Sequence, residues 1–204
     1  MLLIGLTGSI GMGTSTAAAR FRALGLAVID ADAEVHKLYK GAAVAPIEAE
    51  FPGTTRAEGV DRQKLAAALL KDPSGFKHLE AIVHPMVHAA EKALLQAEAA
   101  RGAGMAVLEI PLLFEGGGEK RVDVTVVVSA PAELQRQRVL ARPGMTPEKL
   151  EQILSRQVPD AEKRRRADFV VDTSKTIPES EAQIDKIVAL LRGRLGTAYQ
   201  KHWA

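Results

Sequence analysis

The chain contains 204 residues, of which 47% are hydrophobic and 25% are charged, and its formal net charge is +2. This composition is ordinary for one folded globular domain, so it excludes a disordered or fibrous chain, and the near balance of charge gives no case for a nucleic-acid-binding protein. Because the sequence has no cysteine, a disulfide framework, a cysteine-ligated zinc ion and a catalytic thiol are also excluded.

The first segment of the chain, residues 2–19, carries no charge and superficially suggests a signal peptide or a membrane span. No basic residue precedes it, however, and glycines interrupt its apolar run. A secretory signal needs a basic start and an unbroken apolar centre, and a spanning helix needs about 20 mostly apolar residues. We therefore expect a cytoplasmic protein that does not associate with a membrane.

Short apolar runs alternate with helical patterns along the chain, starting with a predicted strand at 2–6 and a predicted helix at 15–24. Further strands are predicted at 27–30, 105–110, 124–129 and 168–172, and further helices at 61–71, 76–101, 131–141, 147–157 and 178–193. Continuous apolar runs of this length are typical of buried parallel strands. The alternation predicts an α/β fold with a parallel sheet in a three-layer α/β/α arrangement.

The spacing of these elements is uneven, because a long and mostly helical stretch separates the second strand from the third. One crossover helix needs much less chain than this. We therefore expect a single domain made of three parts: a core at 1–32, 102–130 and 168–204, a helical insertion at 33–101, and a helical lid at 131–167. The tail at 197–204, with the single tryptophan Trp203, is expected to be an exposed end.

A glycine-rich loop follows the first strand and has the sequence Gly8-Ser9-Ile10-Gly11-Met12-Gly13-Thr14-Ser15-Thr16. In a phosphate-binding loop, glycines let backbone N–H groups surround phosphate oxygens, and the N-terminus of the next helix adds its positive dipole. The hydroxyl of Ser15 stands where such loops ligate Mg²⁺. A plain glycine turn is the alternative, but the flanking strand and helix and the three glycines favour phosphate binding.

The loop lacks the lysine of the phosphate-binding pattern, because position 14 is a threonine. That lysine normally places a positive charge on the β- and γ-phosphates, where charge is redistributed during transfer. The hydroxyl of Thr14 has no charge, and removal of one strong electrostatic stabiliser costs about 3–4 kcal/mol, or roughly 10²–10³ in rate. We therefore expect nucleotide binding to survive this change better than turnover does.

Two aspartates, Asp30 and Asp32, lie at the carboxyl end of the second strand. Ligands bind at this edge of an open parallel sheet, and a carboxylate there can accept a proton from an attacking hydroxyl. Aspartate is also a preferred residue for capping a helix N-terminus. We assign catalysis to Asp32, and to Asp30 either capping or a contact with a Mg²⁺-bound water.

Other charged residues allow more than one interpretation. Glu109, at the end of the third strand, fits a second Mg²⁺-site position, or the segment is simply an apolar strand stopped by a proline. Arg138 and Arg142 are four apart and share a helix face, which is either solvated or part of a lid that supplies arginines to phosphate. The phosphate loop elsewhere in the chain favours the lid. His84 precedes a proline, and neither a metal nor a base role is assigned to it.

Six segments of the chain, in order, resemble the dephospho-coenzyme A kinase family. They are 5–13, 28–32, 82–85, 111–115, 137–142 and 167–172. The glycine-rich loop alone would be a weak signal. Its combination with Asp-Ala-Asp, His-Pro and Pro-Leu-Leu-Phe-Glu in this order is specific.

The resemblance implies a fold like that of the nucleoside monophosphate kinases, with a five-stranded parallel core that binds nucleotide and a substrate domain at 33–101. It also implies that Mg²⁺ and ATP are used to phosphorylate the 3′-hydroxyl of the ribose in dephospho-coenzyme A. The implied nucleotide-binding residues are Gly8, Gly11, Met12, Gly13, Thr14, Ser15 and Thr16, with Ser15 as the metal ligand. The implied catalytic residues are Asp32, Arg138 and Arg142, and the implied substrate residues are Thr7, Asp32, His84, Leu113 and Phe114.

The chain departs from the family pattern at three places. Thr14 replaces the lysine, Ser9 replaces a commoner glycine, and Asp172-Thr173-Ser174 replaces an Asp-Asn-Asn run near the adenine site. Two hypotheses follow from Thr14: an active kinase in which Arg142 or Lys37 supplies the missing charge, or a nucleotide- or coenzyme-binding protein with negligible turnover. A kinase of another nucleotide-like substrate is a third possibility, against which the His-Pro and Leu-Leu-Phe-Glu segments count.

Overall fold

A computed structural model describes all residues, 1–204, and the chain forms two compact units. The first unit consists of Met1–Ile29 and Leu95–Ala204, and the second consists of Asp30–Leu94. The sequence predicts an insertion at 33–101, and helix α5 (Gly75–Ala100) runs through the second boundary. No helix of the chain combines the length and the apolar character needed to cross a lipid bilayer.

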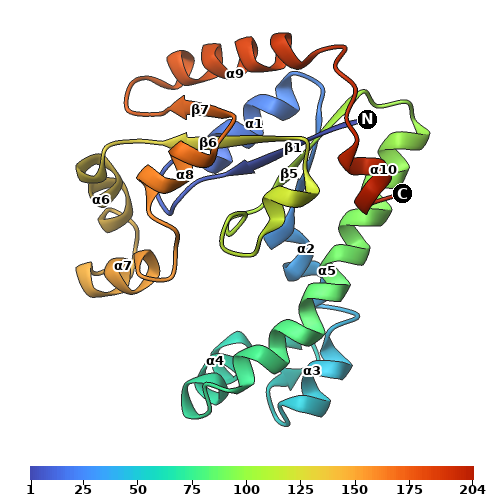
Figure 1. The fold of residues 1–204 in the computed structure, drawn as a ribbon. Coiled ribbons are helices and arrows are strands. Elements are labelled where there is room, and N and C mark those ends of the chain that lie inside the picture. The colour runs from blue at the N-terminus through green and yellow to red at the C-terminus, as the bar shows by residue number, and fades with distance from the viewer. The chain divides into compact units, whose positions relative to one another are not determined.

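The central element is a five-stranded sheet in the order β2-β5-β1-β6-β7 (Figure 1). Its strands are β1 (Leu2–Thr7), β2 (Ala27–Asp30), β5 (Met105–Glu109), β6 (Val124–Ser129) and β7 (Phe169–Asp172). Strand β1 pairs in parallel with β5 and β6, and β6 pairs in parallel with β7. Every residue of β1 and β6 is buried, as expected for strands that are covered on both faces. The predicted α/β fold with a parallel sheet is confirmed, and each predicted strand is within one residue of its observed ends.

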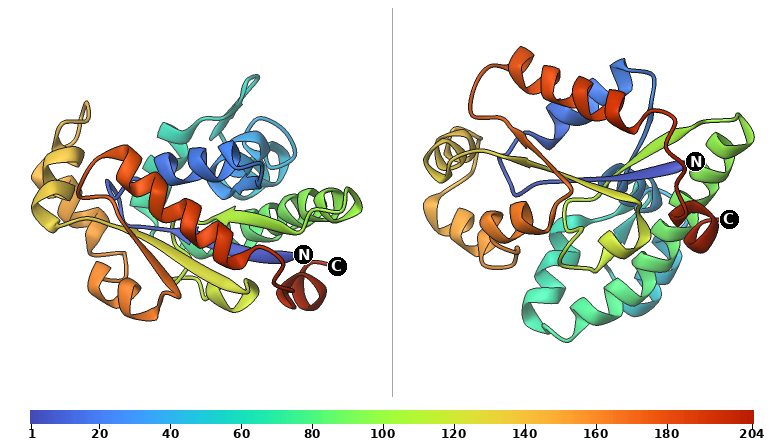
Figure 2. Two further views of the ribbon diagram at one scale, coloured as in Figure 1. Left: turned by 90° about the horizontal axis from the view of Figure 1, so that it is seen from above. Right: turned by 45° about the horizontal axis from the view of Figure 1, so that its top comes forward.

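Helices cover both faces of this sheet. On one face, α1 (Thr14–Ala23) and α9 (Ile177–Leu191) pack side by side, as Figures 1 and 2 show. Leu2, Ile4 and Leu6 belong to the core under these two helices, whereas Leu3 belongs to the core on the opposite face. Alternate side chains of β1 therefore serve two different cores, which is the three-layer arrangement that the sequence predicts.

The remaining elements of the first unit are short. They are the 3₁₀ helix η1 (Gly118–Arg121) and the helices α6 (Ala132–Leu140), α7 (Pro147–Leu154), α8 (Asp160–Arg166) and α10 (Ala198–His202). Helices α6, α7 and α8 occupy the region that the sequence predicts as a lid.

The second unit has its own small core. It contains α2 (Ala31–Leu38), α3 (Val44–Glu50), the hairpin of β3 (Thr55–Arg56) and β4 (Gly59–Val60), α4 (Arg62–Lys71) and most of α5. The buried residues of this core are Ala43, Ile47, Leu65, Leu69 and Val83. Helices α2 and α3 and the hairpin are elements for which the sequence gives no separate prediction.

The C-terminal tail is not an exposed end, so this expectation was wrong. It forms α10, and the side chain of Trp203 is fully buried in the core that contains Leu3. The indole Nε1 donates to the carbonyl of Arg121 at 2.9 Å. The carboxylate of Asp123 accepts from the backbone N–H groups of Leu3 and Ala198. The tail therefore packs beside the start of β1, and the two termini lie near each other (Figure 2).

Truncation of Trp203 tests this packing. We expect Trp203→Ala to lower the free energy of unfolding by about 3–5 kcal/mol, because it removes a large buried ring and leaves a cavity. The measurement is urea unfolding, with Leu195→Ala as the control, since Leu195 is 93% exposed. A loss for Trp203→Ala no larger than that of the control would contradict the observed packing of the tail.

Candidate active site

The phosphate loop occupies residues 8–13, between the end of β1 and the start of α1. Gly11 and Gly13 have φ angles of 78° and 96°, which are left-handed values that favour glycine. Gly13 is the N-cap of α1; no side chain caps this helix, and its first turn has no acidic residue. The first N–H groups of α1 are therefore available to an anion, and the helix dipole favours one.

Side chains from distant parts of the chain hold the loop. The amide of Gln135 donates to the carbonyl of Ile10 at 2.8 Å, and the amide oxygen of Gln157 accepts from the N–H of Ile10 at 3.4 Å. The hydroxyl of Thr173 donates to the carbonyl of Met12 at 2.8 Å. The side chain of Met12 is buried, so its contribution to the loop comes through the backbone. These contacts give the loop its shape before any ligand binds.

Two glycines of the loop are also required by packing. A Cβ atom at Gly8 would lie 2.4 Å from Cγ2 of Val128, and one at Gly11 would lie 2.5 Å from Cγ2 of Val139. Neither neighbour is the end of a long flexible side chain. The loop therefore packs closely against β6 and α6, and larger residues do not fit at these two positions.

The loop opens on a pocket of about 340 Å³ in the first unit. Its lining residues are Gly11, Gly13, Thr16, Ala17, Arg138, Arg142, Val171, Thr173, Lys175, Ile177, Ser180, Glu181 and Ile184. The structure thus brings together five of the predicted site residues, three from the loop region and both arginines. An apolar wall combined with several polar and cationic groups is the usual composition of a small-molecule site.

The prediction that the two arginines share one helix face was wrong, because α6 ends at Leu140, so that Arg138 is on the helix and Arg142 follows it. The two arginines also differ in their hydrogen bonding. The guanidinium of Arg138 donates to the carbonyl of Thr173 at 2.6 Å and lies 3.3 Å from its hydroxyl. The guanidinium of Arg142 is exposed and makes no hydrogen bond or ion pair within the chain. Arg138 therefore helps to build the pocket wall, whereas Arg142 is available to a ligand.

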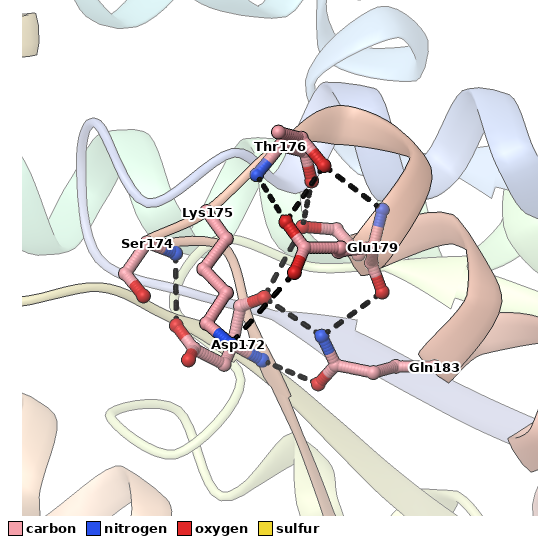
Figure 3. A network of polar contacts seen from close by, with 7 residues as sticks. Asp172, Ser174, Lys175, Thr176, Glu179 and Gln183 are labelled. Carbon is pink, nitrogen blue, oxygen red and sulfur yellow. Dashed lines mark hydrogen bonds and ion pairs between the residues drawn. The ribbon is translucent and has the colours of Figure 1, made fainter.

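The loop between β7 and α9 supplies Lys175 to the pocket, a residue for which the sequence gives no site prediction (Figure 3). It also supplies Thr173, which belongs to the 172–174 run that the family resemblance places near the adenine site. Hydrogen bonds from Ser174 to the carboxylate of Asp172 hold the pKa of this carboxyl below its usual range. Thr176 and Glu179 form a reciprocal capping box at the start of α9. This ordered loop places Lys175, whose Nζ is 3.7 Å from Oε1 of Glu179, at the pocket. For Lys175, the only sequence signal was that the loop follows the carboxyl end of a strand.

Three predicted substrate residues of the first unit are buried and do not line this pocket. The Thr7 hydroxyl donates to the carbonyl of Pro111 at 3.1 Å, which joins the end of β1 to the segment after β5. Leu113 is fully buried and Phe114 almost so. The exposed apolar side chain of this segment is Leu112, at 49% exposure. Contacts of Thr7, Leu113 and Phe114 with substrate remain predictions.

The residues for a metal ion are few. Ser15 is exposed in the first turn of α1, and Glu109 is mostly buried at the end of β5, with Oε2 3.8 Å from Nη2 of Arg22. The chain has no group of three or more histidine, aspartate or glutamate side chains that could hold a metal. A single hydroxyl fits Mg²⁺, because this ion keeps several waters and binds substrate phosphates rather than an all-protein cage.

The predicted base lies in the second unit. Asp30 is the N-cap of α2 and accepts from the N–H of Ala33 at 3.0 Å, which confirms its predicted capping role. Solvent reaches the side chain of Asp32, yet partial burial raises the pKa of its carboxyl. The negative charge of Asp30 raises this pKa further, and the positive charge of Arg62 opposes the increase. The sequence gives no signal for Arg62, which also contacts Nδ1 of His36 at 3.3 Å.

Two other residues of this unit bear on the predictions. His84 is exposed on α5, immediately before the helix-interior Pro85, and its predicted substrate contact remains a prediction. Lys37, a candidate for the missing charge, lies with Nζ 2.6 Å from Oε1 of the buried Glu34. Lys37 is thus already paired, unlike Arg142.

A pair of glycine variants tests the packing of the phosphate loop. Gly11 and Gly25 both have left-handed φ angles, but a Cβ atom at Gly25 meets nothing within 4 Å. We expect Gly25→Ala to lower the free energy of unfolding by about 1 kcal/mol, for backbone strain alone. Gly11→Ala should add the cost of overpacking, about 1–3 kcal/mol, on top of that strain. Equal losses in thermal or urea unfolding would show that the contact with Val139 is unimportant.

Comparison with known proteins gives one consistent result. A family model described as dephospho-CoA kinase matches residues 2–179. The chain is 54% identical to a dephospho-CoA kinase of Mesorhizobium japonicum over 197 residues, which cover 97% of this chain and 100% of that protein. It is 56% identical to a dephospho-CoA kinase of Rhizobium etli over 195 residues, 96% of either chain.

Solved structures agree with these sequence matches. TT1252 from Thermus thermophilus is 37% identical with a TM-score of 0.80, and the match covers 94% of this chain and 98% of that one. A dephospho-CoA kinase from Campylobacter jejuni is 25% identical with a TM-score of 0.70, covering 93% and 96%. With its phosphate loop, pocket arginines and nearly complete sequence match, the chain belongs to the dephospho-CoA kinase family.

Proposed function

We propose that this chain transfers the γ-phosphoryl group of ATP to the 3′-hydroxyl of the ribose in dephospho-coenzyme A, giving coenzyme A and ADP. The observation that carries the proposal is the preformed phosphate loop, which opens on a pocket with two arginines in a chain that matches this family over residues 2–179. The use of ATP also favours the cytoplasm as the place of the reaction.

The proposed roles in nucleotide binding follow from the geometry of the loop. The backbone N–H groups of residues 8–16 surround the phosphates, and Gly11 and Gly13 give the loop its turns. Arg142 contacts the transferring phosphoryl group. Arg138 holds the pocket wall and keeps its full positive charge, because its partners in Thr173 are neutral. Ser15 holds Mg²⁺, which when bound neutralises phosphate charge.

The proposed base is Asp32. The ribose hydroxyl oxygen forms a bond to the γ-phosphorus, the bond from that phosphorus to the β–γ bridging oxygen breaks, and the hydroxyl proton passes to the carboxylate of Asp32. A raised pKa suits this role, because a base is most effective when its pKa approaches the working pH. The carboxylate must be ionised to accept the proton, so the rate should fall as pH drops through this pKa.

Thr14 separates the proposed kinase from a second candidate, a nucleotide- or coenzyme-binding protein with negligible turnover. Thr14 begins α1, where the family pattern has a lysine. Retention of Ser15, Asp32 and both arginines favours catalysis, because a long-degenerate site should lose more than one residue. Within the first unit, Arg142 is the cation best placed to compensate, since it lines the pocket and has no partner in the chain.

The first experiment measures ADP release from Mg²⁺–ATP with and without dephospho-coenzyme A. We expect Thr14→Lys to raise kcat by about 10²–10³-fold, because it restores a charge on the transferring phosphates. Thr14→Gln is the matched control, since it adds length without charge and should leave kcat low. If the unaltered chain and Thr14→Lys turn over equally, another residue supplies the charge, and Arg142→Gln becomes the next test. If neither reacts, the proposed activity is wrong.

The role of Asp32 as the base is tested in the unaltered chain or in the Thr14→Lys variant, whichever of the two is active. We expect Asp32→Asn to lower kcat by about 10²–10⁴-fold while ADP affinity stays nearly unchanged, because only proton transfer is removed. Asp30→Asn keeps a good helix cap but removes a negative charge that raises the pKa of Asp32. It should therefore move the acidic limb of the kcat profile to lower pH. A limb that stays in place, or an active Asp32→Asn variant, would remove Asp32 from this role.

A further inference from the structure

The first unit contains a buried ion pair that has no role in the proposed nucleotide binding. Lys163, on α8, is fully buried, and its Nζ lies 2.9 Å from Oε1 of Glu115. Glu115 belongs to the segment between β5 and η1, whose residues do not line the nucleotide pocket. Removing a lysine and a glutamate from water is costly, and such pairs often add little to stability.

The hydrogen bonding around this pair is incomplete. Oε2 of Glu115, Nζ of Lys163 and Oδ1 of Asp160 are buried without an aligned hydrogen bond. Most buried polar atoms in proteins are hydrogen-bonded, so unsatisfied ones call for an explanation. Stability of the fold alone therefore gives little reason for this pair.

Helix α8 and the residues next to it contact the segment after β5 at several points. Oε1 of Glu115 also accepts from the N–H of Val158, just before α8, at 2.8 Å. The guanidinium of Arg166 lies over the ring of Phe114, 4.6 Å from its centroid, and forms an ion pair with Glu119. Contacts near both ends of α8 therefore hold the segment, and the buried Lys163 lies between them on the helix.

The other side of the same segment is attached to the phosphate-loop strand. The hydroxyl of Thr7, the last residue of β1, donates to the carbonyl of Pro111. Between this bond and the ion pair of Glu115, the side chains of Leu113 and Phe114 point into the protein, and Leu112 is exposed. The two attachments thus determine where the apolar side chain of Leu112 is presented.

The first residue of α8 and the residues before it contact a different part of the first unit. Gln157 accepts from the N–H of Ile10 in the phosphate loop, and Asp160 accepts from the hydroxyl of Ser129 at the end of β6 at 2.8 Å. Residues 157–163 therefore join the phosphate loop to the segment that carries Leu112. The phosphate loop is also held by Gln135 and Thr173, so loss of the Glu115–Lys163 pair leaves these contacts of the loop in place.

We propose that Glu115 and Lys163 are positioning residues for the acceptor substrate, because they fix the 111–115 segment so that Leu112 forms a preformed apolar contact for it. This rests on the proposed function, in which the acceptor is dephospho-coenzyme A. Neither residue contacts the reacting atoms. The pair acts on acceptor binding and leaves nucleotide binding to the pocket beside α1 and α9.

The test measures two dissociation constants by calorimetry, for dephospho-coenzyme A and for Mg²⁺–ADP, in Glu115→Gln, Lys163→Met and the double variant. Glu115→Gln keeps an oxygen for the N–H of Val158, so it is the mildest change. Each single variant should raise the acceptor Kd about tenfold and the ADP Kd less than about twofold, within the usual range for partners in one network. The double variant should bind the acceptor no worse than either single variant. Leu112→Ser should weaken acceptor binding in the same selective way.

The control is Asp168→Asn. The carboxylate of Asp168 accepts from the N–H and hydroxyl of Thr125 at 2.7 and 2.8 Å, at the amino ends of β6 and β7, opposite the phosphate loop. It should lower the melting temperature without selective loss of acceptor binding. Equal weakening of both ligands by the pair variants, or unchanged acceptor binding, would overturn the positioning role. If the unaltered chain binds ADP but no dephospho-coenzyme A, the proposed function fails as well.

Discussion

The central place of β1 in the sheet is the constraint on which the rest of the first unit depends. Two strands lie on each side of it, and the phosphate loop leaves its carboxyl end. In a parallel sheet, all neighbouring strands end at this same edge. The segments after β5, β6 and β7 therefore begin near the phosphate loop, and each contributes residues that contact the loop or line the site. Helix α1 then directs its uncapped N-terminus at the same place.

Hydrogen bonds and an ion pair between these segments fix the shape of the site. Thr173 donates to Met12 and accepts from Arg138 through its carbonyl, so one residue joins the loop after β7, the phosphate loop and α6. On the other side, Gln157 contacts Ile10, and Glu115 contacts Lys163. A loop fixed from both sides pays little ordering cost when a phosphate binds. With a threonine at position 14, the site lacks a lysine charge, while the loop has left-handed turns at Gly11 and Gly13 and an uncapped helix N-terminus.

The sequence predicts the sheet well because its strands are short, mostly apolar runs, which is a local signal, and the strands β1 and β6 are buried throughout. Helices α2 and α3 and the β3–β4 hairpin give no such signal, since their apolar residues are few and find their partners only in the core of the second unit. The tail was predicted wrongly for a related reason. Thr197–Ala204 is short and mixed in composition, and only the core around Leu3 shows that Trp203 is buried.

The candidate site likewise has features that the sequence predicts and features that only the tertiary structure shows. The sequence by itself determined the phosphate loop, Asp30 as a candidate helix cap, and Arg138 and Arg142 as candidate phosphate ligands, because glycine spacing, cap chemistry and the spacing of the arginines involve neighbouring residues. The tertiary structure decided which of these line one pocket, that Arg138 is bonded and Arg142 is not, and that Lys175 and Glu181 join them. It also decided the Glu115–Lys163 pair and the bond from Thr173 to Met12, 161 positions away. Contacts over such separations depend on how the sheet orders its strands, and no local pattern encodes that order.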